Sequence, residues 1–410
     1  MLQRLVGRET RAASGLANPD QWLVDALGGV KTYSGKRVGL EDALALSAFR
    51  SGIYLISETI GLLPFKAYRM DADGNKFEAR QHRSWRMLNE RPNPDTSAHR
   101  FWSTAAIHLR VHGNVFIEKL RGPDGLVAEL WLRDPRNMTV RWNDQLKRKE
   151  YVEDGPYGKM VWDSERMLHI VGWSTNGLYG ESLLWQGRQT LGNAIAREEF
   201  EGSFYKRGAI LSYVIQHPGR LGDAGAKRLR DYFAKWYGGT AQAGKSPVLE
   251  EGAELKTVGS VLKDLEFEAA QTRTRTEVAV MLNMPPAFLG GSTGDSLTYA
   301  TVEANMVQFI MHAISPLAST IQDAVSSDPS IFPWPSQFCE FDLNGMLKGD
   351  SSSRANFYKI MTEIGALTVN EVRAMENREP LDDTELPQEP APPDPTQDPT
   401  ADVPGEPVEA

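Results

Sequence analysis

The sequence predicts an α+β protein in which one long helix leaves a mixed domain and another returns to it. Three patterns indicate this class. Short helices alternate with antiparallel hairpins over residues 40–180, long helical patterns at 181–207 and 264–283 enclose a small insert, and another long amphipathic pattern covers 300–327. Helices mixed with antiparallel hairpins are typical of the α+β class.

Composition limits the kinds of protein this can be. The chain has 410 residues, enough for about two to four domains and a sizeable core. Its single cysteine, Cys339, excludes a disulfide framework and a thiolate metal cluster and is compatible with a reducing interior. We see neither an N-terminal apolar signal segment nor a long uncharged apolar run, so we expect neither secretion nor a membrane span.

The charge of the chain is unevenly distributed. The formal net charge is −9, but residues 379–410 contribute ten acidic residues and no Lys or Arg, which leaves the rest of the chain at +1. Proline is also frequent there, so we expect residues 382–410 to be a disordered acidic tail. A nearly neutral body argues against a basic face that clamps nucleic acid, since each phosphate contact requires a Lys or Arg.

The first elements follow from apolar spacing and turn residues. Residues 1–39 are rich in Gly, Arg and Ser, and we expect them to be flexible. A helix is predicted from Leu40 to Pro64, with buried positions at Leu44, Phe49, Ile53, Ile56 and Ile60. Hairpins are predicted at 65–80, turning near Gly74, and at 114–133, turning at 123–125. Between them we expect helices at 82–94 and 97–113, and after them strands at 138–142 and 166–172.

Short helices and strands are also expected in the insert and in the last part of the chain. Residues 208–257 predict a strand at 209–216, a helix at 224–239 and a strand at 246–252. The helix before the insert, 181–207, would be about 40 Å long. A strand at 337–347 is expected to rejoin the first domain. Two helices follow, the first capped by Asp350 and Gly365, the second by a Thr368–Glu371 capping box.

The segment Asp264–Val325 organises the rest of the chain. It reads as a helix, a proline-glycine break and a longer helix whose apolar face is formed by Val302, Met306, Phe309, Ile310, Ala313, Leu317, Ile321 and Val325. Pro316 should kink this helix near its middle.

The loop inside that segment suits a gate, a lid or a finger that touches something moving. It is longer than usual helix connectors, and Phe288, Leu289, Leu297 and Tyr299 are suited to anchor its base. We therefore expect a functional loop instead of a plain solvated connector. The polar belt at 271–277 (QTRTRTE) fits a solvated face or a polar subunit interface equally well.

The search for catalytic or metal-binding motifs gives no constellation. Residues 239–246 match the P-loop pattern with Lys245, but a helix precedes them and Pro247 with a strand-like run follows, so a flexible turn is the better interpretation. His108 and His112 lie one turn apart without a carboxylate companion, which favours packing over metal binding. We find neither a nucleophile elbow nor paired carboxylates, and expect no enzyme activity and no cofactor.

An ordered set of short stretches resembles the portal protein family of tailed bacteriophages and related prophage particles. Each stretch is short and consists partly of residues that are common in turns. Their order and spacing, from about residue 40 to 381, make them specific together. They are ERPNP (90–94), HGNVFIEKLRGPDG (112–125), LHIVGWSTNGLYGESLL (168–184), PVLEEG (247–252), MPPAFLG (284–290) and GALTVNEVRAMENREPL (365–381).

The resemblance implies a ring, usually of twelve subunits, at one capsid vertex, through which double-stranded DNA is packaged and released. The implied parts are a wing (40–180, with strand 337–347), stem helices (181–207 and 264–283), a clip (208–263), a tunnel loop (284–299), a long kinked helix with its connector (300–336) and a crown (348–381). Residues 1–39 and 382–410 flank them. Portal proteins carry no ATPase, in agreement with the rejected P-loop.

The resemblance also implies partners and contacts. The partners are further copies of the chain, DNA bound without sequence preference, the large terminase subunit, the capsid and scaffold proteins, and head-completion proteins, in a virion assembled in the host cytoplasm. We expect the loop to touch DNA through Gly291, Ser292, Thr293, Gly294, Asp295 and Ser296. Lys206 and Arg207 are expected to form a cationic ring near the clip. The rival classes are a head–tail adaptor ring with no role in gripping DNA, and a nucleotide hydrolase that uses Lys245.

Overall fold

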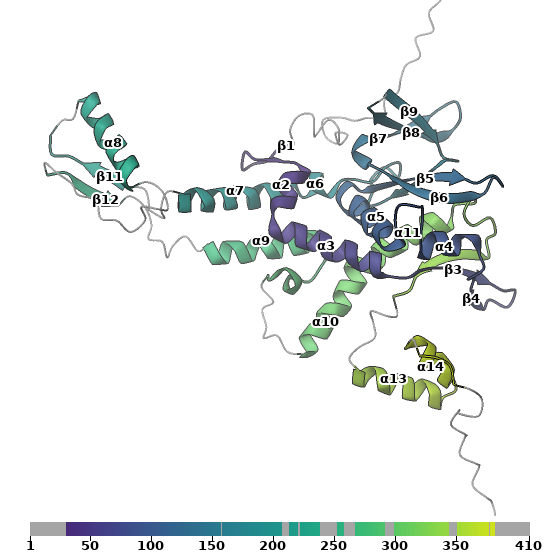
Figure 1. Ribbon diagram of the computed structural model, residues 1–410. Helices are drawn as coiled ribbons and strands as arrows, with labels where there is room; N and C mark the ends of the chain where they lie inside the picture. Colours follow the sequence, from purple (N-terminus) through teal and green to yellow (C-terminus); the bar gives the residue numbers. More distant parts are fainter. Residues whose placement is uncertain are drawn as a thin grey trace, which may run out of the picture. The chain divides into compact units, whose positions relative to one another are not determined.

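The computed structural model describes residues 30–156, 158–206, 213–219, 222–237, 252–257, 267–291, 299–343, 351–376 and 378–381. The chain divides into two units, residues 1–343 and 344–410, and each is described by itself. Helices and small antiparallel sheets build the first unit (Figure 1), which confirms the predicted α+β class.

The centre of the first unit is helical, and α3 (Ser47–Leu62), which follows α2 (Leu40–Ala45), packs against α5 (Ala98–His112). The single helix predicted from Leu40 is wrong, because Leu46 adopts an extended conformation (φ −66°, ψ 114°) and separates α2 from α3. Phe49, Ile53, Ile56 and Ile60 are buried as predicted, whereas Leu44 is only half-buried. Gly113 ends α5 in the left-handed region (φ +74°), as a C-terminal glycine does.

The strand that returns from the end of the unit completes the first sheet. Its order is β13–β3–β4, with β3 (Phe65–Met70), β4 (Lys76–Glu78) and β13 (Gln337–Phe341) all antiparallel. The rings of Phe65 and Phe341 stack with centroids 4.0 Å apart, and Trp102 of α5 packs edge-on against Phe65. The predicted return of this strand is confirmed. Helix α4 (Arg83–Asn89) follows β4.

Two further three-stranded sheets pack against each other. The first has the order β10–β5–β6, and the second has the order β7–β8–β9. Their shared core contains Phe116, Tyr151, Trp162 and Met167. The strand bounds are β5 (Asn114–Arg121), β6 (Val127–Arg133), β7 (Met138–Asn143), β8 (Arg148–Gly155), β9 (Gly158–Asp163) and β10 (Met167–Val171). The sequence analysis missed β8 and β9, whose charged residues hide the apolar alternation.

Three glycines join β5, β10 and the segment that leads into the next helices. A Cβ built on Gly180 would lie 1.8 Å from the Gly113 carbonyl oxygen, and one on Gly172 would lie 2.9 Å from the same atom. The Asn114 amide locks this contact, because it donates to the Gly180 carbonyl (2.8 Å) and accepts from the Gly180 N–H (2.8 Å). The junction accounts for HGN (112–114) and YGE (179–181), which lie in the stretches 112–125 and 168–184 of the sequence analysis, as places where two backbones pack closely.

The helical region 181–207 is interrupted. Helix α6 (Leu183–Gln186) ends at Gly187, and α7 (Arg188–Lys206) follows, so the unbroken 27-residue helix predicted is wrong. The regular part, α7, has 19 residues. Met281 of α9 (Phe267–Met281) presses on this break, since a Cβ on Gly187 would lie 2.2 Å from its sulfur.

Part of the segment expected to be flexible, residues 1–39, forms a hairpin instead. Strands β1 (Val30–Lys31) and β2 (Arg37–Val38) pair antiparallel. Thr32 is buried and contacts α7 where Gly192 leaves room for it. Lys36 forms an ion pair with Glu199 of the same helix. These long-range contacts, which the local composition does not reveal, correct the prediction for residues 30–39.

The long helix 300–327 is divided into three parts. They are α10 (Tyr299–Phe309), a π-helical turn η5 (Ile310–Ile314) and α11 (Ser315–Ser326). Pro316 lies in the first turn of α11, directly after the π-helical turn, so the helix is interrupted where the kink was predicted, and the kink itself stays a prediction. Beyond α11, Asp328 receives a hydrogen bond from Lys119 of β5 at 2.6 Å, and both side chains are almost fully buried.

The insert contains a two-stranded sheet and a helix. Strand β11 (Tyr213–Gln216) pairs antiparallel with β12 (Glu254–Thr257), and α8 (Asp223–Tyr237) lies between them in sequence. The sequence analysis missed β12. The predicted strand 246–252 and the rejected P-loop match lie almost wholly outside the described residues.

The second unit has two described helices, α13 (Ser351–Glu363) and α14 (Val369–Met375). The predicted capping box is confirmed, since Thr368 N–H donates to Glu371 (2.8 Å) and Glu371 N–H donates to the Thr368 hydroxyl (3.2 Å). Gly365 has a positive φ of 71°, as expected for a helix end. Asp350 and the tail 382–410 lie outside the described residues.

Candidate functional site

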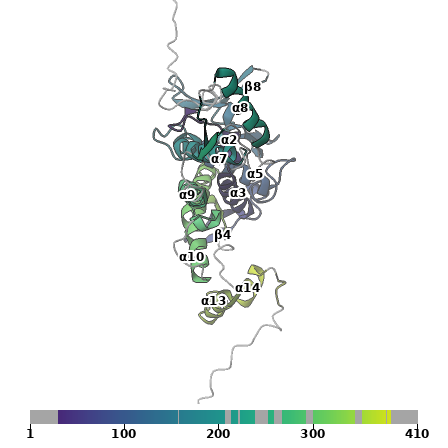
Figure 2. The ribbon, with the colours of Figure 1, turned by 90° about the vertical axis from the view of Figure 1, so that its left-hand side faces the viewer.

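Helices α7 and α9, which flank the insert in sequence, lie side by side (Figure 1 and Figure 2) and hold each other by polar contacts. Arg197 of α7 donates to the Thr274 hydroxyl at 2.7 Å and forms an ion pair with Glu277 at 3.3 Å. Gln271 donates to Glu201 at 3.0 Å. Part of the polar belt 271–277 is therefore used within the subunit, on the side that faces α7.

The two helices end in an aromatic cluster beside Lys206. Phe204 of α7 is buried, and its ring centroid lies 5.5 Å from that of Phe267, the first residue of α9. Lys206, the last residue of α7, is exposed and makes neither a hydrogen bond nor an ion pair with any described residue. Arg207, its predicted companion, lies outside the described residues.

The chain leaves α9 through a tight, apolar turn. Asn283 adopts a left-handed conformation (φ +57°), and Arg110 of α5 donates to the Leu282 carbonyl at 3.3 Å. Helix α9 meets α3 closely here, since a Cβ on Gly52 would lie 2.2 Å from the Leu282 side chain. The end of α9 is thus fixed from two sides by the helical centre of the unit.

A short 3₁₀-helix, η4 (Pro286–Leu289), forms the base of the glycine-rich loop. Gly290 ends it in the left-handed region (φ +69°), and the Gly291 N–H donates to the Pro286 carbonyl at 2.8 Å. Phe288 packs against Phe309 of α10 with centroids 5.0 Å apart. The predicted anchors Phe288 and Leu289 therefore hold the base, and Leu297 and the side chain of Tyr299 lie outside the described part.

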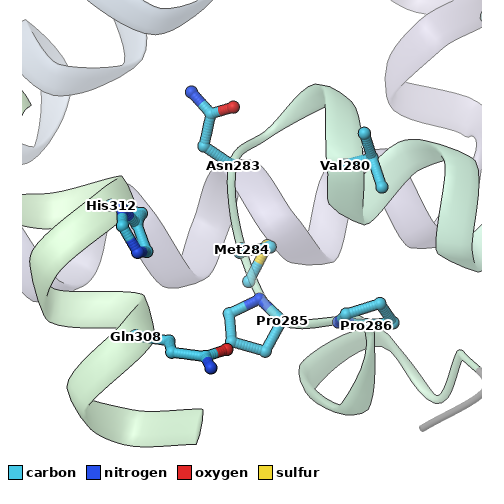
Figure 3. A pocket seen from close by; sticks show the side chains of 7 residues that line it. All are labelled: Val280, Asn283, Met284, Pro285, Pro286, Gln308 and His312. Carbon is cyan, nitrogen blue, oxygen red and sulfur yellow. The ribbon is translucent and has the colours of Figure 1, made fainter. Parts of the chain in front are cut away.

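A pocket of about 450 Å³ lies between the end of α9 and the helix after the loop. Gln308 and His312 face Met284 and Pro285 across it, and Val280 and Asn283 complete most of the rim (Figure 3). Prolines, a methionine and one exposed histidine supply no acid–base pair. The pocket thus has the composition of a packing surface.

The apolar face of the long helix is only partly buried in the subunit. Phe309, Ile310, Ala313, Leu317, Ile321 and Val325 are buried, as predicted. Val302 (54% exposed) and Met306 (39% exposed), which share the predicted apolar face, are exposed in the single subunit, while Phe309 contacts Phe288 at the loop base.

Two histidines on α5, His112 buried and His108 half-buried, do not form a metal site within the described residues. The rings of His108 and His112 are 6.3 Å apart, and neither Nδ1 atom has a hydrogen-bond partner there. Burial lowers the pKa of each imidazole to about 4. Among the described residues no group of three or more potential metal ligands occurs.

Of the eight site residues predicted from the sequence, the structure describes Gly291 and Lys206. It places Gly291 at the loop base and Lys206 at the end of α7, and it does not bring the two together. Ser292, Thr293, Gly294, Asp295, Ser296 and Arg207 lie outside the described residues. The sequence analysis missed Arg275, whose guanidinium approaches the Gly290 carbonyl (3.4 Å). In the described part, no helix is both long and apolar enough to span a membrane.

Comparison with known proteins identifies the fold and the family. Two solved chains share the fold. A chain in the virion of the native gene transfer agent particle is 19% identical, with a TM-score of 0.56 over 88% of this chain and 99% of that chain. An HK97-family phage portal protein from Corynebacterium diphtheriae is 15% identical, with a TM-score of 0.56 over 77% of this chain and 99% of that one.

The family model for phage portal proteins matches residues 47–377, and the chain belongs to this family. The portal protein of Enterobacteria phage HK97 is 25% identical over 350 residues, covering 83% of this chain and 80% of the relative. The probable portal protein of Streptomyces phage phiC31 is 25% identical over 371 residues, covering 87% and 79%. The predicted family is thus confirmed, and this family is a structural component of particle assembly.

Proposed function

We propose that the chain forms a homo-oligomeric ring at one capsid vertex and that double-stranded DNA passes through this ring during packaging and ejection. The observation that carries the proposal is the pairing of α7 with α9. Helix α7 leads the chain to the insert, and α9 leads it back to the anchored base of the loop. The chain also belongs to the portal family. A ring of twelve is proposed, because one solved relative is the neck of a gene transfer agent particle computed with C12 symmetry.

The parts of the subunit are proposed to be those of a portal. The wing is residues 40–180 with β13, the stem is α7 and α9, the clip is 208–263, the tunnel loop is 284–299 and the crown is 348–381. The terminase and later the head-completion proteins would dock at the clip, and the capsid and scaffold proteins would contact the ring. The particle location and assembly in the host cytoplasm belong to the same proposal.

A channel protein of this kind has to let DNA slide. Each phosphate neutralised by a cation adds sequence-independent affinity, so a channel lined with many cations would hold DNA in place. The near-neutral body and the small, weakly polar side chains of Ser292, Thr293 and Ser296 support passage without tight binding. The anchored base of the loop, with Phe288 against Phe309, would keep the contacting segment at a fixed height.

Deletion of residues 291–296 tests this function. We expect rings with the wild-type subunit number by native mass spectrometry, because the deleted segment lies beyond the Phe288–Phe309 anchor. Particles assembled with the variant should package less DNA or lose it after packaging, measured as protected DNA per particle.

Two outcomes of the deletion would contradict the proposal. Loss of the ring would make the loop an assembly element, and unchanged DNA content would favour an adaptor ring that joins particles without touching moving DNA. Binding of a nucleotide that Lys245→Ala abolishes would instead support the hydrolase class.

A further inference from the structure

Arg275 of α9 lies on the base of the loop and has no acidic partner among the residues that the structure describes. Its Nη1 atom is 3.4 Å from the Gly290 carbonyl oxygen, a long hydrogen bond, and a Cβ built on Gly290 would lie 3.5 Å from the same nitrogen. The side chain is exposed, and it makes no ion pair with any residue that the structure describes. Within the described part of the chain, this charge is therefore held beside the loop without a carboxylate to neutralise it.

Thr276, the next residue of α9, lies against Gly291, the next residue of the loop. A Cβ on Gly291 would lie 2.9 Å from the Thr276 hydroxyl oxygen and 2.9 Å from the Pro286 Cβ, so the Gly291 backbone lies directly on the helix. Gly290 needs its positive φ of 69° for the chain to turn there. The first residues of the loop thus cross α9 at Arg275 and Thr276.

The chemistry of this cation suits one ligand class. Arginine has five N–H donors in a planar fork that matches phosphate oxygens, and only one of these donors faces Gly290. Two other arginines nearby, one on α7 and one in the belt, differ from Arg275. Arg197 is engaged by Thr274 and Glu277 on the side that faces α7, and Arg273 is two residues away, a spacing at which helical side chains do not share a face.

We propose that Arg275 is a phosphate-binding residue of the channel, positioned by the Gly290 carbonyl to touch the backbone of passing DNA. This inference rests on the proposed function and adds one specific contact to it. One arginine per subunit gives a sparse ring of cations, which attracts DNA weakly enough that it still slides. The proximity of the residue to Gly290 and Gly291 places the contact at the fixed base of the loop.

Salt-dependent DNA binding by assembled rings of the full-length chain tests the role of Arg275. The probe is linear double-stranded DNA of random sequence, titrated between about 50 and 200 mM salt. For Arg275→Gln we expect the slope of log K against log salt, which is negative, to become shallower by about 1 or more. Arg275→Lys, which keeps the charge, should retain the wild-type slope.

Arg273→Gln is the matched control, since it removes the same charge from an exposed position on the same helix. We expect no change in its slope. An unchanged slope for Arg275→Gln would overturn the inference, and so would an Arg273→Gln slope that becomes shallower by the same amount. Arg275→Gln chains that form no rings would also overturn it, because Arg275 would then be an assembly residue.

The two proposals fail in different ways. Wild-type chains that form no ring, or particles that fill with DNA independently of this protein, would contradict the portal function itself. Wild-type rings that conduct DNA, combined with an Arg275→Gln variant that binds and packages like the wild type, would contradict only the role of Arg275.

Discussion

At the scale of single residues, the protein encloses three histidines, of which His112 is buried and His108 and His169 are half-buried. His108, His112 and His169 lie inside the first unit, where burial lowers their pKa values to about 4, about 4 and about 3. His169 stacks on Phe116 with centroids 4.5 Å apart, and its Nε2 is 3.0 Å from the Asn114 side-chain oxygen. These groups are neutral in the folded chain at neutral pH.

Their titration predicts a stability that falls on acidification. The unfolded chain takes up a proton at each histidine near pH 6.5, whereas the folded chain resists protonation until about pH 4 for His108 and His112. The free energy of unfolding should therefore decrease as the pH falls from 6.5 to 4, by on the order of 3 kcal/mol for each of these two histidines. Above pH 6.5 they add no pH dependence.

Urea unfolding at pH 7.0, 5.5 and 4.5 measures this effect. His112→Gln should show a smaller decrease than the wild type, because one buried titrating group is removed. His312→Gln is the control, since His312 is exposed. Equal pH dependence in His112→Gln and the wild type would rule out the buried histidine as a source.

At the scale of elements, glycines decide where helices and strands approach. Gly52 lets α3 meet the end of α9, Gly187 admits Met281, and Gly180 admits the Gly113 carbonyl. Each position places a neighbouring group where a Cβ would otherwise be. The junction at Gly180 has the greatest effect, since the chain passes from the sheets into α6 and α7 directly after it.

Gly180→Ala should destabilise the protein by at least about 3 kcal/mol, because a Cβ 1.8 Å from a backbone oxygen forces the junction apart. Thermal or urea unfolding of the variant measures the loss. Gly202→Ala is the control. It lies inside α7 with no atom near the added methyl group, so we expect stabilisation by about 0.5–1 kcal/mol. Similar effects of the two substitutions would contradict the close contact.

Local sequence signals predicted many of these elements correctly. The Gly113 helix end, the hairpin that turns at Gly125 and the capping box at Thr368 each depend on a few adjacent residues, and all three are confirmed. The break at Leu46 was missed, because leucine is a good helix former and no Gly or Pro marks the position at which the backbone becomes extended. The burial of Thr32 likewise depends on Gly192, far along the chain.

The candidate site was less predictable than the fold. The apolar anchors of the loop were visible as a cluster of Phe288 and Leu289, and both hold the base. The approach of Arg275 to Gly290 could not be read from the sequence, since it depends on η4 turning the chain back across α9. The alternating Thr and Arg of the belt gave the only signal, and it did not show which arginine meets the loop.

At the scale of the whole molecule, charge is separated along the chain. The body carries +1 and the segment 379–410 carries −10, so cations within the body have to act locally if they guide DNA. Lys206 at the exposed end of α7, with Arg207 after it, is such a local pair in the sequence.

Replacing Lys206 and Arg207 by alanine should reduce the packaging rate or the retention of DNA, and the reduction should diminish at high salt because screening weakens the wild-type contact. Packaging assays at several salt concentrations measure this. Arg141→Ala with Lys159→Ala is the control, since it removes the same charge from the β7–β8–β9 sheet. If the Lys206 and Arg207 variant behaves like the wild type at all salt concentrations, these residues do not form the proposed cationic ring.

The return of β13 to β3 also governs how the protein is made. Strand β3 is complete at Met70 and pairs with β4 on one side, but its partner on the other side, β13, starts only at Gln337, so roughly 270 residues must be synthesised before that edge is covered. At about 5–20 residues per second, the ribosome needs roughly 15 to 55 seconds for this. During that time the ring of Phe65 lacks Phe341, and the nascent chain presents an open strand edge. Folding of the first unit is therefore completed late in translation, and the burial of Lys119 with Asp328 waits for the same stretch of chain.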